Sequence, residues 1–211
     1  MIITSLGHSC FKIQDKDVIL VTDPFDQSTG LKTPRLKADI VTISHDHHDH
    51  NNVSAIMGNP FVISGPGEYE VKGVFVYGIP GYHDKKQGAE RGPITMYLIE
   101  MEDLSLAHLG DLGCLLNDDQ LEKLEGADIL MIPVGGKYTI NAKEAVEVIN
   151  QIEPRIVIPM HYKVPGLKVT VDPVDIFCKE MGIKKIEGLD KLKISKKDLP
   201  AEETKVIILK S

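Results

Sequence analysis

The chain has 211 residues, 42% of them hydrophobic, which is enough to bury the core of one globular domain spanning residues 1–211. The 31 acidic residues outnumber the 24 Lys and Arg, and the formal net charge of -7 repels nucleic acid. The longest apolar runs, such as residues 18–21 and 206–209, are far shorter than the roughly 20 residues of a membrane-spanning helix. We therefore expect neither a nucleic-acid partner nor a membrane.

Strands are predicted throughout the first half of the chain, where short β-branched and apolar runs alternate with polar or glycine breaks. They fall at residues 2–6, 11–14, 18–22, 40–44, 61–64, 74–79, 94–101 and 104–108. The first of these strands are expected to pair antiparallel. A short helix is expected near residues 52–57.

From about residue 117 the pattern changes to helices that alternate with strands. Helix starts are indicated by Asn117 with Gln120, by Asn141 with Glu144 and by Asp172 before Pro173, and helix ends by Gly126 and Gly182. Apolar strands are predicted at residues 129–133, 156–159 and 205–209. The order predicts an α+β fold in which two β-sheets pack face to face with helices outside.

The segment Ser-His-Asp-His-His-Asp-His at residues 44–50 directly follows a predicted strand. Packing alone does not readily explain four His and two Asp within six residues. The alternative to a metal-binding segment is a solvated loop rich in His. Neutral imidazoles with carboxylates suit Zn, Mn or Fe. An extended backbone points His45 and His47 to the same side, and Asp49 and His50 then turn toward a second position.

This segment resembles the HxHxDH motif of the metallo-β-lactamase superfamily, which His45, His47, Asp49 and His50 match in full. The superfamily's other motifs follow in order at Asp23, His83, Asp111 and His161, so the resemblance covers residues 2 to about 175. Residues 6–9, 135–139 and 159–162 are similar to the short branch that includes ascorbate-6-phosphate lactonase and many metal-dependent hydrolases.

The resemblance implies an αββα sandwich with a dinuclear metal site at one edge of its sheets. It implies that one metal is held by His45, His47 and His83, the other by Asp49, His50 and His161, and that Asp111 bridges them. It also implies that Asp23 orients a ligand or a loop from behind the site.

The function that the resemblance implies is hydrolysis by a hydroxide shared between two divalent ions, Zn before Mn or Fe. The substrate would be a small ester, lactone, amide or phosphodiester, and Asp49 would position the attacking water as well as bind metal. Only 50 residues follow His161, so a cap domain does not fit, and a small soluble substrate is favoured over RNA. Homo-oligomer formation is left open.

Two alternatives come from other classes of protein. A diiron redox protein uses the same fold, but such relatives place an acidic residue where His47 stands and add a flavodoxin domain. A non-catalytic metal-binding module would retain the ligands without the chemistry. A phosphodiesterase acting on lipid or nucleotide would share the hydrolytic mechanism.

Several residues keep two interpretations. His108 competes with His83 for the first metal, although a strand position favours a buried role for His108. His8 is expected to be packed and hydrogen-bonded rather than to contact substrate. Loop residues Arg91, Lys137 and Tyr138 can reach an anionic or carbonyl substrate, but a surface location explains them equally well. Asp46 and His48 are expected to face solvent.

The chain has three cysteines, an odd number, which lie far apart in the sequence and form no CxxC pair: Cys10, Cys114 and Cys178. We expect neither a disulfide framework nor a thiolate metal site, and each is interpreted as a small apolar residue. The first residues do not resemble a secretory signal, and a reducing cytoplasm fits this cysteine usage.

Overall fold

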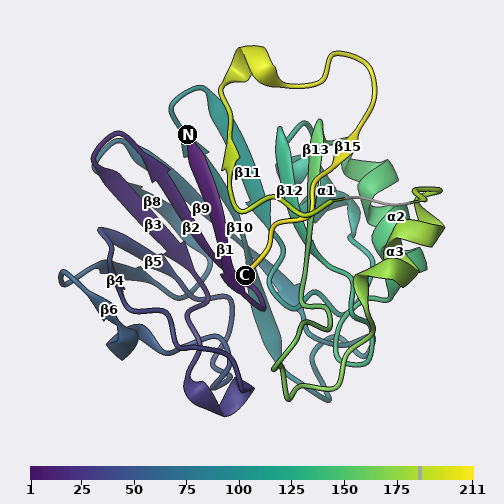
Figure 1. Ribbon diagram of the computed structural model, residues 1–211, viewed down its shortest axis with the longest axis horizontal. Helices are drawn as coiled ribbons and strands as arrows, with labels where there is room; N and C mark the ends of the chain where they lie inside the picture. The colour runs from purple at the N-terminus through teal and green to yellow at the C-terminus, as the bar shows by residue number, and fades with distance from the viewer. Residues whose placement is uncertain (185–186) are drawn as a thin grey trace.

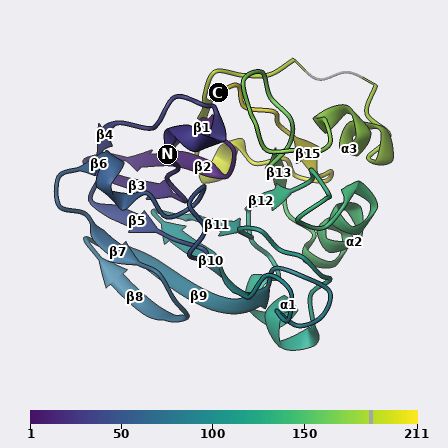
Figure 2. The same ribbon diagram turned by 90° about the horizontal axis from the view of Figure 1, so that it is seen from below.

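The structure is a computed structural model that describes residues 1–184 and 187–211, and its main feature is a pair of β-sheets packed face to face (Figures 1 and 2). The first sheet has the order β14 (Leu192–Lys193), β1 (Ile2–Gly7), β2 (Cys10–Asp15), β3 (Val18–Thr22), β5 (Ile40–Thr42) and β7 (Phe61–Ile63). The second has the order β15 (Lys205–Val206), β13 (Ile156–Met160), β12 (Ile129–Pro133), β11 (Leu104–His108), β10 (Pro93–Met101), β9 (Val74–Tyr82) and β8 (Gly67–Val71). The pair β4 (Leu36–Lys37) and β6 (Ile56–Met57) forms a separate two-stranded sheet.

The core between the sheets follows from the two-residue period of the strands. In β12, Ile129 and Met131 join Leu20 of the first sheet in one buried cluster, whereas Leu130 packs into a second cluster on the helix side. Because successive side chains point to opposite faces, a strand buried on both faces must be apolar throughout. Each fully buried aliphatic side chain contributes about 1.5–3 kcal/mol. The continuous apolar runs of the second sheet therefore reflect its central position.

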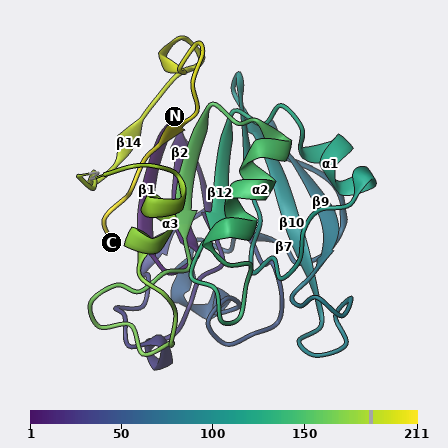
Figure 3. The ribbon, with the colours of Figure 1, turned by 90° about the vertical axis from the view of Figure 1, so that its right-hand side faces the viewer.

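The α-helices cover the outer face of the second sheet, where α2 lies in front of β12 with α3 beside it in Figure 3. They are α1 (Asp118–Leu124), α2 (Ala142–Ile152) and α3 (Val174–Glu180). The predicted caps of the first two are confirmed, since Asn117 and Asn141 each form a reciprocal capping box. Within the part of the chain that the structure describes, no helix is long and apolar enough to cross a membrane.

Loops cover the outer face of the first sheet, and the helix predicted in this region is absent. Residues 52–57 do not form a helix: they form the single 3-10 turn η2 (Val53–Ala55) and then strand β6. The segment before Gly58 and Pro60 is too short for its helical hydrogen bonds to offset the free-energy cost of nucleating an α-helix. Ile56 instead packs with Val21 and Phe25 against the first sheet.

Other boundaries differ by a few residues, and the second sheet gains a strand that was not predicted. Strand β8 was not predicted because it is an edge strand directly after Gly65-Pro66, and none of its residues is buried. Strand β9 continues to Tyr82, beyond the predicted residue 79, despite Gly78, Pro80 and Gly81. The last strand is shorter than residues 205–209. The extension of β9 matters because it carries the chain directly to His83.

Tyr97 ties the two sheets together near the end of β5. It projects from β10 of the second sheet, is fully buried, and its hydroxyl lies 2.7 Å from Ile43 O and 3.2 Å from Ile63 O in the first sheet. Ile63 O also accepts a hydrogen bond from Ile43 N at 2.8 Å. Burial raises the pKa of the phenol, so the hydroxyl stays a donor.

We predict that Tyr97→Phe lowers the free energy of unfolding by about 1–2 kcal/mol, because the buried Ile43 carbonyl loses its donor. Urea unfolding of the two proteins measures the difference. Tyr82→Phe is the matched control, since Tyr82 is 37% exposed and its hydroxyl bonds none of the described residues. Equal stability of Tyr97→Phe and wild type would contradict the proposed tie.

Candidate metal centre

The candidate site lies where several strands end at one edge of the sandwich. β3 and β5 run parallel in the first sheet, and β11, β12 and β13 run parallel in the second. β9 and β11 both pair antiparallel with β10, so they point the same way. The carboxyl ends of these strands therefore deliver Asp23, the segment 44–50, His83, Asp111 and His161 to one place.

The segment after β5 turns back on itself at His47. His47 O accepts hydrogen bonds from the backbone N–H groups of His50 at 2.8 Å and Asn51 at 3.1 Å. This turn, rather than the start of a helix, redirects the chain between His47 and Asp49. It sends His45 and His47 to one group of side chains and Asp49 and His50 to another.

The first group consists of His45, His47 and His83, whose ring nitrogens lie within 4.8 Å of one another. Nε2 of His45 lies 2.9 Å from Nδ1 of His47, and Nδ1 of His45 lies 2.9 Å from the Ser44 hydroxyl. Desolvation by burial, with a contribution from His50, lowers the pKa of His45 to about 3. The ring is therefore neutral, which is the form that binds a metal.

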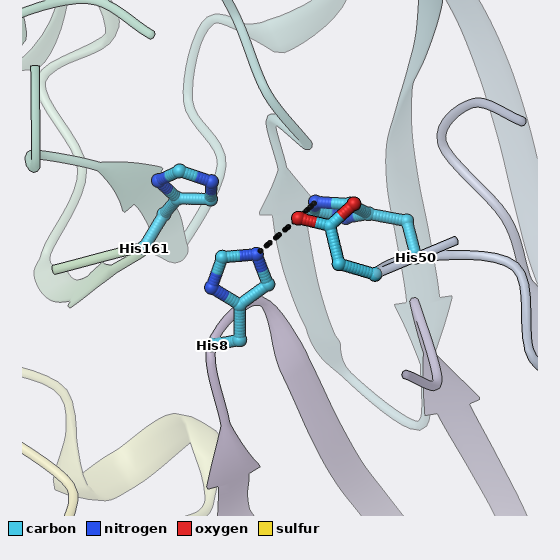
Figure 4. A group of neighbouring side chains, drawn as sticks. His8, His50 and His161 are labelled. Atoms are coloured by element: carbon cyan, nitrogen blue, oxygen red, sulfur yellow. Dashed lines mark hydrogen bonds and ion pairs between the residues drawn. The ribbon is translucent and has the colours of Figure 1, made fainter. Parts of the chain in front are cut away.

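The second group consists of Asp49, His50, His161 and His8, with ligand atoms again within 4.8 Å of one another (Figure 4). His8 lies in the turn between β1 and β2, and its Nε2 is 3.2 Å from Asp49 Oδ2. Its buried ring packs 4.2 Å from the His161 ring. His8 is thus packed and hydrogen-bonded, as predicted, but its partner is a candidate ligand.

Asp111 connects the two groups. Its Oδ2 lies 3.1 Å from Nε2 of His161, 3.4 Å from Nε2 of His50 and 3.5 Å from Nε2 of His83. Burial opposes ionisation of this carboxyl, but the electrostatic influence of His161 and His50 outweighs it and holds the pKa well below the usual range. Asp111 is therefore a buried anion surrounded by imidazoles from both groups.

Asp23 supports the site from behind. It is fully buried and accepts hydrogen bonds from Ser44 N at 2.7 Å and Ser44 Oγ at 2.6 Å, and its Oδ2 lies 2.9 Å from His50 Nδ1. Holding Nδ1 in this way leaves Nε2 of His50 directed toward Asp111. This geometry fits the orienting role that the resemblance implies for Asp23.

His108 is buried away from both groups. Its Nε2 lies 2.9 Å from Ser9 O, and its Nδ1 accepts a weak hydrogen bond from Gly110 N at 3.4 Å. It therefore links the turn that carries His8 to the loop that carries Asp111. The structure places His83, and not His108, with the first group.

The two groups fit divalent metal ions. Nε2 of His50 and Oδ1 of Asp111 are buried and find no hydrogen-bond partner among the described residues. Unpartnered buried polar atoms cost free energy, and several gathered in one place indicate a missing partner. Neutral imidazoles and carboxylates are ligands that Zn, Mn and Fe accept.

A cleft of about 660 Å³ opens over these groups. Its lining includes the candidate ligands His47, His83, Asp49, Asp111 and His161. This volume is in the range of small-molecule sites.

The rim of the cleft includes Arg91 and Tyr138, two of the predicted substrate contacts. Lys137, the third, is exposed on the adjacent turn and does not line the cleft, so its predicted contact gains no support. Lys168 also lines the rim but was missed, because nothing in its local sequence marks it. Ser44 was missed too, although its place beside His45 was a signal.

A sandwich of two sheets with histidines and carboxylates at one edge defines the metallo-β-lactamase class of protein. A family model described as the beta-lactamase superfamily domain matches residues 2–161. A UPF0173 metal-dependent hydrolase of Thermococcus onnurineus is 30% identical over 74% of this chain and 82% of its own. The chain therefore belongs to the beta-lactamase superfamily, within its branch of UPF0173 metal-dependent hydrolases.

Solved structures agree with this assignment. A candidate Zn-dependent hydrolase of the metallo-β-lactamase superfamily from Thermotoga maritima is 37% identical, covers 99% of this chain and 97% of its own, and has a TM-score of 0.81. A metallohydrolase of Ignicoccus hospitalis, 19% identical over 92% of this chain and 99% of its own, shares the fold with a TM-score of 0.64. The predicted superfamily and fold are confirmed.

We predict that His83→Ala reduces the metal content of the protein and leaves the fold near normal. His108→Ala should retain metal and lose about 1–3 kcal/mol of stability, because Ser9 O and Gly110 N lose a buried partner. Elemental analysis and urea unfolding of metal-free protein measure the two effects separately. Metal loss in His108→Ala but not in His83→Ala would reverse the assignment.

Proposed function

We propose that this protein hydrolyses a small ester, lactone, amide or phosphodiester with two divalent metal ions. The observation that carries the proposal is the position of Asp111 Oδ2, within 3.5 Å of imidazoles from both groups. One ion would be held by His45, His47 and His83 and the other by Asp49, His50 and His161, with Asp111 between them.

Two ions bound there would polarise the scissile group and lower the pKa of a shared water toward neutrality. The side chains of this protein would place the reacting groups. His8 Nε2 lies 3.2 Å from Asp49 Oδ2 and, as a donor, would fix this carboxylate, which would bind metal and also position the attacking water. Asp23 keeps His50 directed into the site through its Nδ1. The cleft of about 660 Å³ suits a small substrate.

Zinc is the ion that we propose first, because the Thermotoga maritima relative at 37% identity is named for dependence on Zn. The same ligand atoms also accept Mn or Fe, so the preference is to be measured. A non-catalytic metal-binding module is the second candidate. No feature of the cleft favours this candidate, because Asp49 and Asp111 line the cleft together with Arg91 and Tyr138.

The test uses untagged protein, stripped of metal and reconstituted with Zn or Mn. We expect two ions per chain by elemental analysis, and hydrolysis of at least one compound among lactones, esters and phosphodiesters. Asp111→Asn should weaken both sites, because it removes a charge that both groups share. Asp49→Ala should abolish turnover through misplacement of the water.

Asp46→Asn is the matched control, since Asp46 is an exposed residue of the same segment and should keep both metal and activity. One ion or none per wild-type chain would contradict the two-metal proposal. Two ions without turnover of any compound would favour the non-catalytic module.

A further inference from the structure

Two cations on the rim of the cleft are unneutralised. Neither the Arg91 guanidinium nor the Lys168 ammonium makes a hydrogen bond or ion pair with a side chain in residues 1–184 or 187–211. The one acidic rim residue, Glu90, already pairs with Lys86 at 2.7 Å. A protein of net charge -7 therefore presents free positive charge at the mouth of its cleft.

Arg91 is held in place by the residue next to His83. The buried carboxylate of Asp84 accepts backbone N–H bonds from Lys86 at 2.7 Å, Gly88 at 3.1 Å, Glu90 at 3.0 Å and Arg91 at 2.8 Å. These bonds close residues 84–91 into a compact loop. The backbone of Arg91 is thus fixed relative to His83 before any substrate binds.

Tyr138 further restricts the Arg91 side chain. The guanidinium carbon lies 5.6 Å from the centre of the Tyr138 ring, within reach of a cation–π interaction. This contact uses one face of the guanidinium and leaves its N–H donors at the edge. A planar fork of donors with restricted motion is suited to a carboxylate or phosphate, which it binds with two parallel hydrogen bonds.

We propose that the substrate carries a carboxylate or phosphate group away from its scissile bond, and that Arg91 binds this group with support from Lys168. The inference rests on the proposed function and specifies its substrate class. A preorganised arginine stabilises the bound anion without a large loss of side-chain freedom. Arg91 would thereby select anionic substrates over neutral ones of the same size.

A set of matched esters tests the inference on the Zn-reconstituted protein. The probes are 4-nitrophenyl pentanoate and two analogues whose terminal methyl group is replaced by carboxylate or phosphonate. We expect kcat/KM to be about tenfold or more higher for at least one charged ester, as for a charge-assisted bidentate contact. Whether carboxylate or phosphonate is preferred identifies the natural group.

Substitutions of Arg91 test whether the preference for charged esters comes from the rim of the cleft. Arg91→Gln should remove most of the preference for charged esters through a raised KM for those esters, and Arg91→Lys should restore only part of it. Arg35→Gln is the control, because Arg35 is exposed, lies outside the cleft and changes the net charge equally. Equal kcat/KM for neutral and charged esters in the wild type would overturn the inference.

A binding measurement separates this inference from the proposed function. Glutarate and methylphosphonate are titrated calorimetrically into wild type, Arg91→Gln and Arg35→Gln. If no ester is hydrolysed, weaker binding by about tenfold in Arg91→Gln alone still supports the anion site, and hydrolysis of these esters is what fails. Equal affinity of wild type and Arg91→Gln for both anions would overturn the anion site, whether or not turnover occurs.

Discussion

The buried Asp111 carboxylate, with imidazole nitrogens of His161, His50 and His83 within 3.5 Å, is the interaction around which the molecule is organised. A charge taken out of water and left with unpartnered neighbours costs several kcal/mol. The apolar core between two sheets must offset that cost, and bound cations would remove much of it. Cations bound at the site would therefore stabilise the fold.

The backbone around the site shows how closely its parts must approach. A Cβ on Gly135 would lie 2.0 Å from His161 O, and one on Gly113 would lie 2.2 Å from the His83 carbonyl carbon, so both positions require glycine. His8, Asp23 and His161 adopt left-handed conformations with φ of 56, 37 and 53°. Residues other than glycine adopt such conformations rarely, and these persist where surrounding structure imposes them.

The sequence predicted most of the strands and candidate ligands because both follow local rules. Strand β3 and the capping boxes at Asn117 and Asn141 rest on local chemistry and fall where predicted. The helix expected near residues 52–57 was wrong, because the few residues before Gly58 and Pro60 form a 3-10 turn and strand β6 instead. The position of Lys168 on the cleft depends on three-dimensional contacts that no spacing in the sequence reveals.

The most direct test of the account is anomalous diffraction at the zinc edge from crystals of the reconstituted protein. We expect two peaks, with ligand nitrogens and oxygens at about 2.0–2.2 Å. The first should contact His45, His47 and His83, and the second Asp49, His50 and His161, with Asp111 reaching both. A single peak, or two peaks of which neither contacts Asp111, would contradict the account.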